Sequence, residues 1–66
     1  MKQIVATYTQ GKFSITIFSV NLEDEPQYYQ VVIIYHHKTP VRYETDHITL
    51  EDAKNYMVLN IMNYPL

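Results

Sequence analysis

The stretch from Ile4 to Val20, IVATYTQGKFSITIFSV, decides the fold of this chain. Apolar and polar residues alternate over residues 4–9 and again over residues 13–20. This period is typical of strands that cover a core with one face. Gly11, the only glycine, lies between the two runs, where a tight hairpin needs a residue that tolerates a positive φ. The stretch therefore predicts an antiparallel β-hairpin.

The turn also predicts a register for this hairpin. We expect Gln10 and Gly11 to form a two-residue loop, with glycine in the second central position. The predicted pairs across the strands are Thr9–Lys12, Tyr8–Phe13, Ala6–Ile15 and Ile4–Ile17. All the apolar pairs then lie on one face, so the turn and the hydrophobic pattern agree.

Two further strands and one helix complete the predicted fold. Residues 28–37 contain an unbroken aliphatic run, which indicates a central strand covered on both faces. Residues 41–47 alternate and carry one charged face, as is typical of a protected sheet edge. Thr49 is a suitable N-cap for an amphipathic helix over residues 50–63. We expect one α+β domain over residues 1–66, a small antiparallel β-meander packed against one C-terminal α-helix.

One helix can cover only one face of such a sheet. Val5, Phe18, Val20 and one side of the strand over residues 28–37 have no obvious cover in the sequence. An apolar sheet face that remains open usually marks an interface. We therefore expect a homodimer or a protein partner.

Composition narrows the functional class. The chain has 66 residues, seven tyrosines, no cysteine and a formal net charge of −2. A chain without cysteine suits the cytoplasm. No apolar run approaches the ~20 residues that span a membrane. Nucleic-acid binding needs a basic surface, which a net charge of −2 does not indicate. No nucleophile motif or cofactor motif is present. We expect a non-enzymatic protein without a cofactor that binds neither nucleic acid nor membrane.

The histidines are the residues that could hold a metal. His36 and His37 are adjacent in a predicted strand and should point to opposite faces, so they do not suit one ion. His47 could join one of them across the turn, with Asp46 or Glu44 nearby. Turn-flanking polar residues explain this pattern better than a metal site does, so we predict no metal site.

Tyrosines and carboxylates are the candidate partner-binding residues. Tyrosine is a large amphipathic side chain that is enriched at interfaces. The candidate anchors are Tyr28, Tyr29, Tyr35 and Tyr43, and the candidate acidic contacts are Glu23, Asp24, Glu25, Glu44 and Asp46. The alternatives are that the tyrosines pack across strands, that they stack on single-stranded nucleic acid, and that the carboxylates are only solvated.

One resemblance bears on these residues. Residues 23–29, EDEPQYY, resemble the acidic turn and Gln-Tyr-Tyr of the small uracil-DNA glycosylase inhibitor family of Bacillus phages, and the order of elements over residues 13–62 is similar. The resemblance implies a dimeric DNA mimic that blocks the glycosylase groove, with Glu44 as an acidic contact. This chain differs by its additional N-terminal strand, by Pro26 and by a lower acidic content.

The preferred hypothesis is a small inhibitor or modulator of a larger host enzyme, encoded by a phage or mobile element. Its tyrosines would anchor the partner, and its carboxylates would orient it. The alternative hypothesis is a structural or assembly protein that forms homo-oligomers through the open sheet face. A single-stranded nucleic-acid binder is a third class, which the scarcity of Lys and Arg disfavours.

Overall fold

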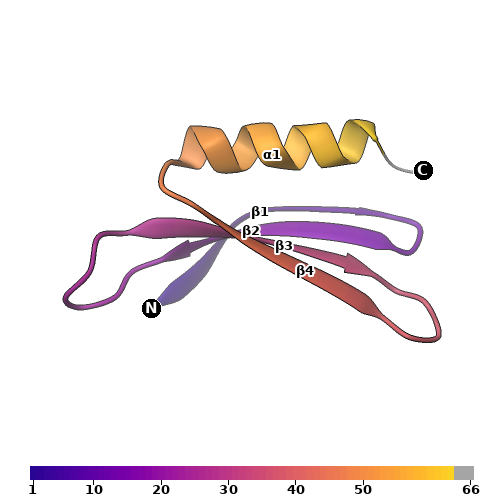
Figure 1. The fold of residues 1–66 in the computed structure, drawn as a ribbon, viewed down its shortest axis with the longest axis horizontal. Helices are drawn as coiled ribbons and strands as arrows, with labels where there is room; N and C mark the ends of the chain where they lie inside the picture. The colour runs from indigo at the N-terminus through magenta and orange to yellow at the C-terminus, as the bar shows by residue number, and fades with distance from the viewer. Residues whose placement is uncertain (64–66) are drawn as a thin grey trace.

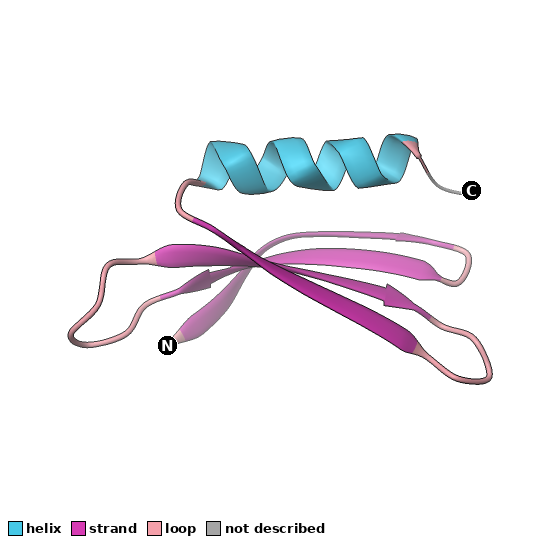
Figure 2. Ribbon diagram, in the orientation of Figure 1, coloured by secondary structure: helices cyan, strands magenta, loops and turns pink. Residues whose placement is uncertain are grey.

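The fold is a four-stranded antiparallel sheet with one helix on one side (Figure 1, Figure 2). The computed structural model describes residues 1–63. Its elements are β1 (Lys2–Gln10), β2 (Phe13–Val20), β3 (Tyr28–Tyr35), β4 (Val41–His47) and α1 (Leu50–Met62). The strand order is β1-β2-β3-β4, so every strand pairs with its neighbour in the chain. The predicted α+β meander, with β3 central and β4 at the edge, is confirmed.

The first hairpin forms with a different loop from the predicted one. Gln10 pairs with Phe13 and Tyr8 pairs with Ile15, so the loop is Gly11 and Lys12. Gly11 has a φ of 58° and no other described residue has a positive φ, which matches a type II′ turn with glycine first. Our predicted register is therefore wrong by two residues. Because a shift of two preserves the alternation, Tyr8 still faces the core.

A β-bulge in β1 causes a second difference. The register between β1 and β2 shifts between Ile4 and Ala6: Ile4 pairs with Phe18 and Ala6 pairs with Ile17, which leaves Val5 as the additional residue. The predicted pair of Ile4 with Ile17 is therefore wrong. The bulge moves Ile4 from the helix-covered face to the opposite face.

The core lies between the sheet and α1. Its buried residues come from β2, β3 and α1, and they are Phe13, Ile15, Ile17, Val31, Ile33, Ala53 and Met57. The helix begins as expected, because the Thr49 hydroxyl accepts a hydrogen bond from the Asp52 backbone N–H at 3.1 Å. Ala53 and Met57 then face the sheet. The predicted helix end at residue 63 is one residue late, since Asn63 is the C-cap.

The strand β3 is shorter than the predicted range 28–37. Tyr35 is the last residue paired on both sides, with Phe13 and Val41. His36 then donates its backbone N–H to the Lys12 carbonyl at 2.7 Å, and the chain turns toward β4. His36 and His37 thus belong to the β3–β4 loop and not to β3.

The face opposite α1 has no cover within residues 1–63, as expected. Figure 2 shows the helix on one side of the sheet only. Phe18 and Ile34 are half-buried there, and only neighbouring side chains shield Val32, which is 4% exposed. Within the same residues, α1 falls short of the length and the apolar character that a membrane crossing requires.

Candidate functional site

Most acidic residues of the chain lie at one end of the sheet, and several basic residues lie at the other. The first residues, the β2–β3 loop and the β4–α1 junction lie at one end: Asn21 donates its backbone N–H to the Met1 carbonyl at 2.8 Å, and Tyr29 pairs with His47. All the acidic residues except Glu44 lie there, namely Glu23, Asp24, Glu25, Asp46, Glu51 and Asp52. We call this group the acidic end.

The opposite end is basic. The β1–β2 turn and the β3–β4 loop meet there, as the hydrogen bond from His36 to Lys12 shows. Lys12, Lys38 and Arg42 lie at this end and no acidic residue does. We call these residues the basic end. The molecule therefore carries opposite charge at its two ends, although its net charge is only −2.

The carboxylates of the acidic end are exposed and are not neutralised. Among residues 1–63 the ion pair between Arg42 and Glu44 is the only one. Lys2 is also at this end, but its Nζ lies 4.5 Å from the centre of the Phe18 ring. Because the six carboxylates of the acidic end outnumber Lys2, this end has a negative potential that extends about a Debye length, ~10 Å, into solution.

Apolar side chains accompany these carboxylates. Ile48 is 84% exposed in the β4–α1 junction, and Leu22 is 45% exposed at the start of the β2–β3 loop. Tyr28 is half-buried beside Val20, with which it pairs. Exposed apolar side chains surrounded by charges are typical of a protein-binding surface. The acidic end with Leu22, Tyr28 and Ile48 is the candidate site.

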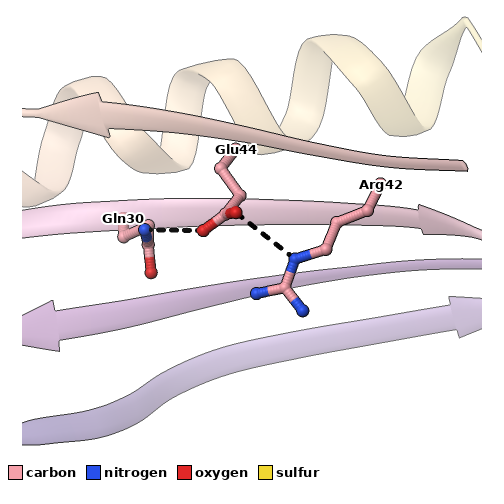
Figure 3. A network of polar contacts seen from close by, with 3 residues as sticks. All are labelled: Gln30, Arg42 and Glu44. Atoms are coloured by element: carbon pink, nitrogen blue, oxygen red, sulfur yellow. Dashed lines mark hydrogen bonds and ion pairs between the residues drawn. The ribbon is translucent and has the colours of Figure 1, made fainter.

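Glu44 lies apart from this site and is held by its own sheet (Figure 3). Gln30 donates from Nε2 to Glu44 Oε1 at 2.9 Å, and Arg42 Nε lies 3.4 Å from Glu44 Oε2. Both oxygens of Glu44 thus have a partner. Asp46, two residues further along β4, has no hydrogen-bond or ion-pair partner among residues 1–63 and is the more available carboxylate.

The structure separates the candidate tyrosines. Only Tyr28 lies beside the acidic end on the open side of the sheet. Tyr29 packs against the core on the helix side. Tyr35 packs against Phe13 with ring centroids 5.4 Å apart, and Tyr43 contacts Tyr35 edge to face at 6.2 Å, both near the basic end. Packing within the fold therefore accounts for Tyr29 and Tyr35, whereas Tyr43 is 55% exposed.

The histidines lie in three different environments. His36 Nε2 is 3.2 Å from the Ser14 hydroxyl, and the His37 ring stacks on Tyr35. His47 hydrogen-bonds Thr45 at 2.9 Å and packs against Tyr56. Within residues 1–63 no three His, Cys, Asp or Glu side chains are close enough to hold one metal ion, and no pocket is found.

The sequence interpretation missed part of the acidic end. It did not include Glu51 and Asp52 among the candidate acidic contacts and did not single out Leu22 or Ile48. Strand order alone could have found them. In an antiparallel meander the fourth strand ends beside the loop between the second and third strands, so a helix that follows directly begins there.

Comparisons with known proteins add no function to this geometry. No protein family, no curated protein and no solved structure matches this chain. The chemical character of the site is that of a binding surface, in which exposed carboxylates supply attraction at long range and apolar side chains supply contact area.

Proposed function

We propose that this chain is a small non-enzymatic protein that binds and inhibits, or modulates, a larger enzyme through its acidic end. The observation that carries the proposal is the grouping of unneutralised carboxylates with the exposed apolar residues Leu22 and Ile48 at one end of a rigid sheet. The charges attract and orient a basic partner, and the apolar side chains supply affinity after contact.

The partner that fits this surface has a basic groove with an apolar pocket. Grooves that bind the DNA backbone have that charge, and a row of carboxylates can replace the phosphates. The resemblance of residues 23–29 to uracil-DNA glycosylase inhibitors makes that enzyme the first target to test. Because Glu44 is engaged by Gln30 and Arg42, the loop carboxylates and Asp46 are better contacts than Glu44.

The test is uracil excision from duplex DNA by a uracil-DNA glycosylase, with and without this chain. The combined variant Glu23→Gln, Asp24→Asn, Glu25→Gln removes three charges from an exposed loop. The matched control, Lys12→Gln with Lys38→Gln, changes only the basic end. We expect inhibition by the wild-type chain and by the control, and about tenfold weaker inhibition by the loop variant.

Two results would refute parts of the proposal. Unchanged excision at a large molar excess of the chain removes uracil-DNA glycosylase as the target. The wider claim, that the acidic end binds basic grooves, is then tested by measuring whether the chain competes with duplex DNA for binding to other DNA-binding enzymes. Equal inhibition by the wild type and the loop variant would show that the acidic end is not the contact surface.

An assembly protein is the second candidate function, and the open apolar sheet face favours it. In that case the surface carboxylates are dispensable and the chain acts only by joining copies of itself. The loop variant separates the two functions, because it should weaken inhibition about tenfold, whereas a protein that acts only by joining copies through the open sheet face does not need the loop carboxylates.

A further inference from the structure

The face of the sheet opposite α1 has an apolar centre. Its apolar side chains come from β1, β2 and β3: Ile4, Phe18 and Val20 lie toward the acidic end, and Val32 and Ile34 lie on β3 opposite Thr16 and Ser14. The same face also carries the polar side chains of Lys2, Thr7, Thr9, Ser14, Thr16, Tyr28 and Gln30, and Arg42, Glu44 and Asp46 border it on β4. We call these residues the open face. Lys2 Nζ lies 4.5 Å from the centre of the Phe18 ring.

Association by the sheet edges is disfavoured. The bulge at Val5 interrupts the outer hydrogen-bonding edge of β1, and Lys2 lies near the start of that strand. The other edge strand, β4, carries Arg42, Glu44 and Asp46. Bulges and charges are the devices by which edge strands avoid pairing with a second sheet. The open face is therefore the surface through which two copies can associate.

The size of the open face suits a dimer. Four strands about 4.8 Å apart and about eight residues long at ~3.3 Å per residue give a footprint of roughly 500 Å² per copy. Two copies then bury about 1,000 Å², which is near the lower limit of a specific interface. This area is below that of obligate dimers, so we expect reversible self-association.

The two charged ends select one orientation. In a face-to-face pair related by a twofold axis that runs across the strands, the acidic end of each copy lies over the basic end of the other. An axis along the strands would instead bring the two acidic ends together, and like charges in contact are unfavourable. We propose that a second copy of this chain covers the open face in the first, antiparallel arrangement.

The strand β4 shows this complementarity in its sequence. Arg42 and Asp46 lie two residues on either side of Glu44, so that antiparallel β4 strands place Arg42 of each copy near Asp46 of the other. Glu44 Oε2 lies 3.4 Å from Nε of Arg42, and a guanidinium has five N–H donors, so Arg42 can also bind a second carboxylate. Packed sheets lie about 10 Å apart, a gap that Arg and Asp side chains can bridge. Glu44 lies near the twofold axis, with its charge compensated inside each copy.

The dimer does not depend on the proposed inhibitory function. The β2–β3 loop projects beyond the end of the sheet (Figure 1), so Glu23, Asp24 and Glu25 remain accessible when the open face is covered. Asp46 and Tyr28 lie on the covered face, so the dimer offers a partner the loop carboxylates and not these two residues. The dimer therefore presents two such loops, at opposite ends. A failure of dimerisation leaves the inhibition assay unaffected, and a failure of inhibition leaves the mass measurement unaffected.

Sedimentation equilibrium over a micromolar to millimolar concentration series tests the proposal. We expect the mass to rise from 7.9 kDa for the monomer toward twice that value. Ile34→Lys, on the half-buried open face, should weaken association about a hundredfold, because it places a charge in the apolar centre. Leu59→Lys is the matched control, since Leu59 is 57% exposed on α1, away from the open face.

Two complementary charge variants test the orientation. Arg42→Glu and Asp46→Lys should each associate about tenfold more weakly than the wild type, because each homodimer gains two repulsive contacts. An equimolar mixture should recover association. In the mixed dimer the carboxylate introduced by Arg42→Glu meets the ammonium introduced by Asp46→Lys, and the native Arg42 of one copy meets the native Asp46 of the other. Circular dichroism of each variant establishes that it is folded.

Several outcomes would overturn the proposal. A wild-type mass of 7.9 kDa at the highest concentration excludes the dimer. Association that survives Ile34→Lys places the interface elsewhere. Loss of association in Ile34→Lys, together with no recovery in the mixture of charge variants, excludes the antiparallel orientation.

Discussion

Replacing Gly11 with alanine isolates the cost of a positive φ in the β1–β2 turn. Gly11 has a φ of 58°, and a Cβ added there would meet no atom within 4 Å. Steric contact with the rest of the protein therefore contributes nothing, and the backbone strain of an L-residue remains. That strain is about 1–2 kcal/mol. For a domain of this size we expect the melting temperature to fall by about 4–16 °C.

A series at this position separates strain from other causes. Gly11→Asn should cost less than Gly11→Ala, because asparagine tolerates a positive φ better than other side chains. A D-alanine at position 11, introduced by chemical synthesis, has the matching chirality and should stabilise the fold by about 0.4–1 kcal/mol through the unfolded state. Lys12→Ala, in the same loop without a positive φ, is the control and should change little.

The assay is thermal and urea unfolding followed by circular dichroism at one fixed protein concentration, because association would stabilise the fold. If Gly11→Ala unfolds at the same temperature as Lys12→Ala, the residue does not hold a positive φ. If D-alanine destabilises the fold more than L-alanine, the backbone at position 11 has a negative φ and the turn is not of type II′.

Three further variants test the remaining structural interpretations by the same unfolding assay. Met57→Ala should destabilise the fold by about 2–4 kcal/mol, because Met57 is 8% exposed in the core. The control Met62→Ala, at a residue that is 75% exposed, should cost under about 0.5 kcal/mol, and equal costs would contradict the helix orientation. Thr49→Ala should cost about 1 kcal/mol through loss of the helix cap, whereas Thr49→Ser should retain the cap; equal losses would argue against the capping bond. Glu44→Gln should cost under about 1 kcal/mol because its ion pair is exposed, and a larger loss would mean that Glu44 is more buried than the structure indicates.

Local features of the chain determined most of the elements. Alternation over residues 13–20 has a strand period, the aliphatic run of β3 requires cover on both faces, and Thr49 provides a hydroxyl three residues before the N–H that it caps. These signals act between residues that are near in sequence, so they can be read without knowledge of the fold. The open sheet face could also be predicted from the sequence, because a single helix cannot cover two faces of a sheet.

Only the tertiary structure decided the register and the site. The type II′ loop and the bulge at Val5 depend on how β1 fits against β2, and apolar alternation is equally satisfied by a shift of two residues. The pairing of Glu44 with Gln30 and Arg42 depends on β3 and β4 lying side by side. The acidic end likewise collects residues from a loop, a strand end and a helix start. Such contacts join distant parts of the chain, and no local pattern encodes them.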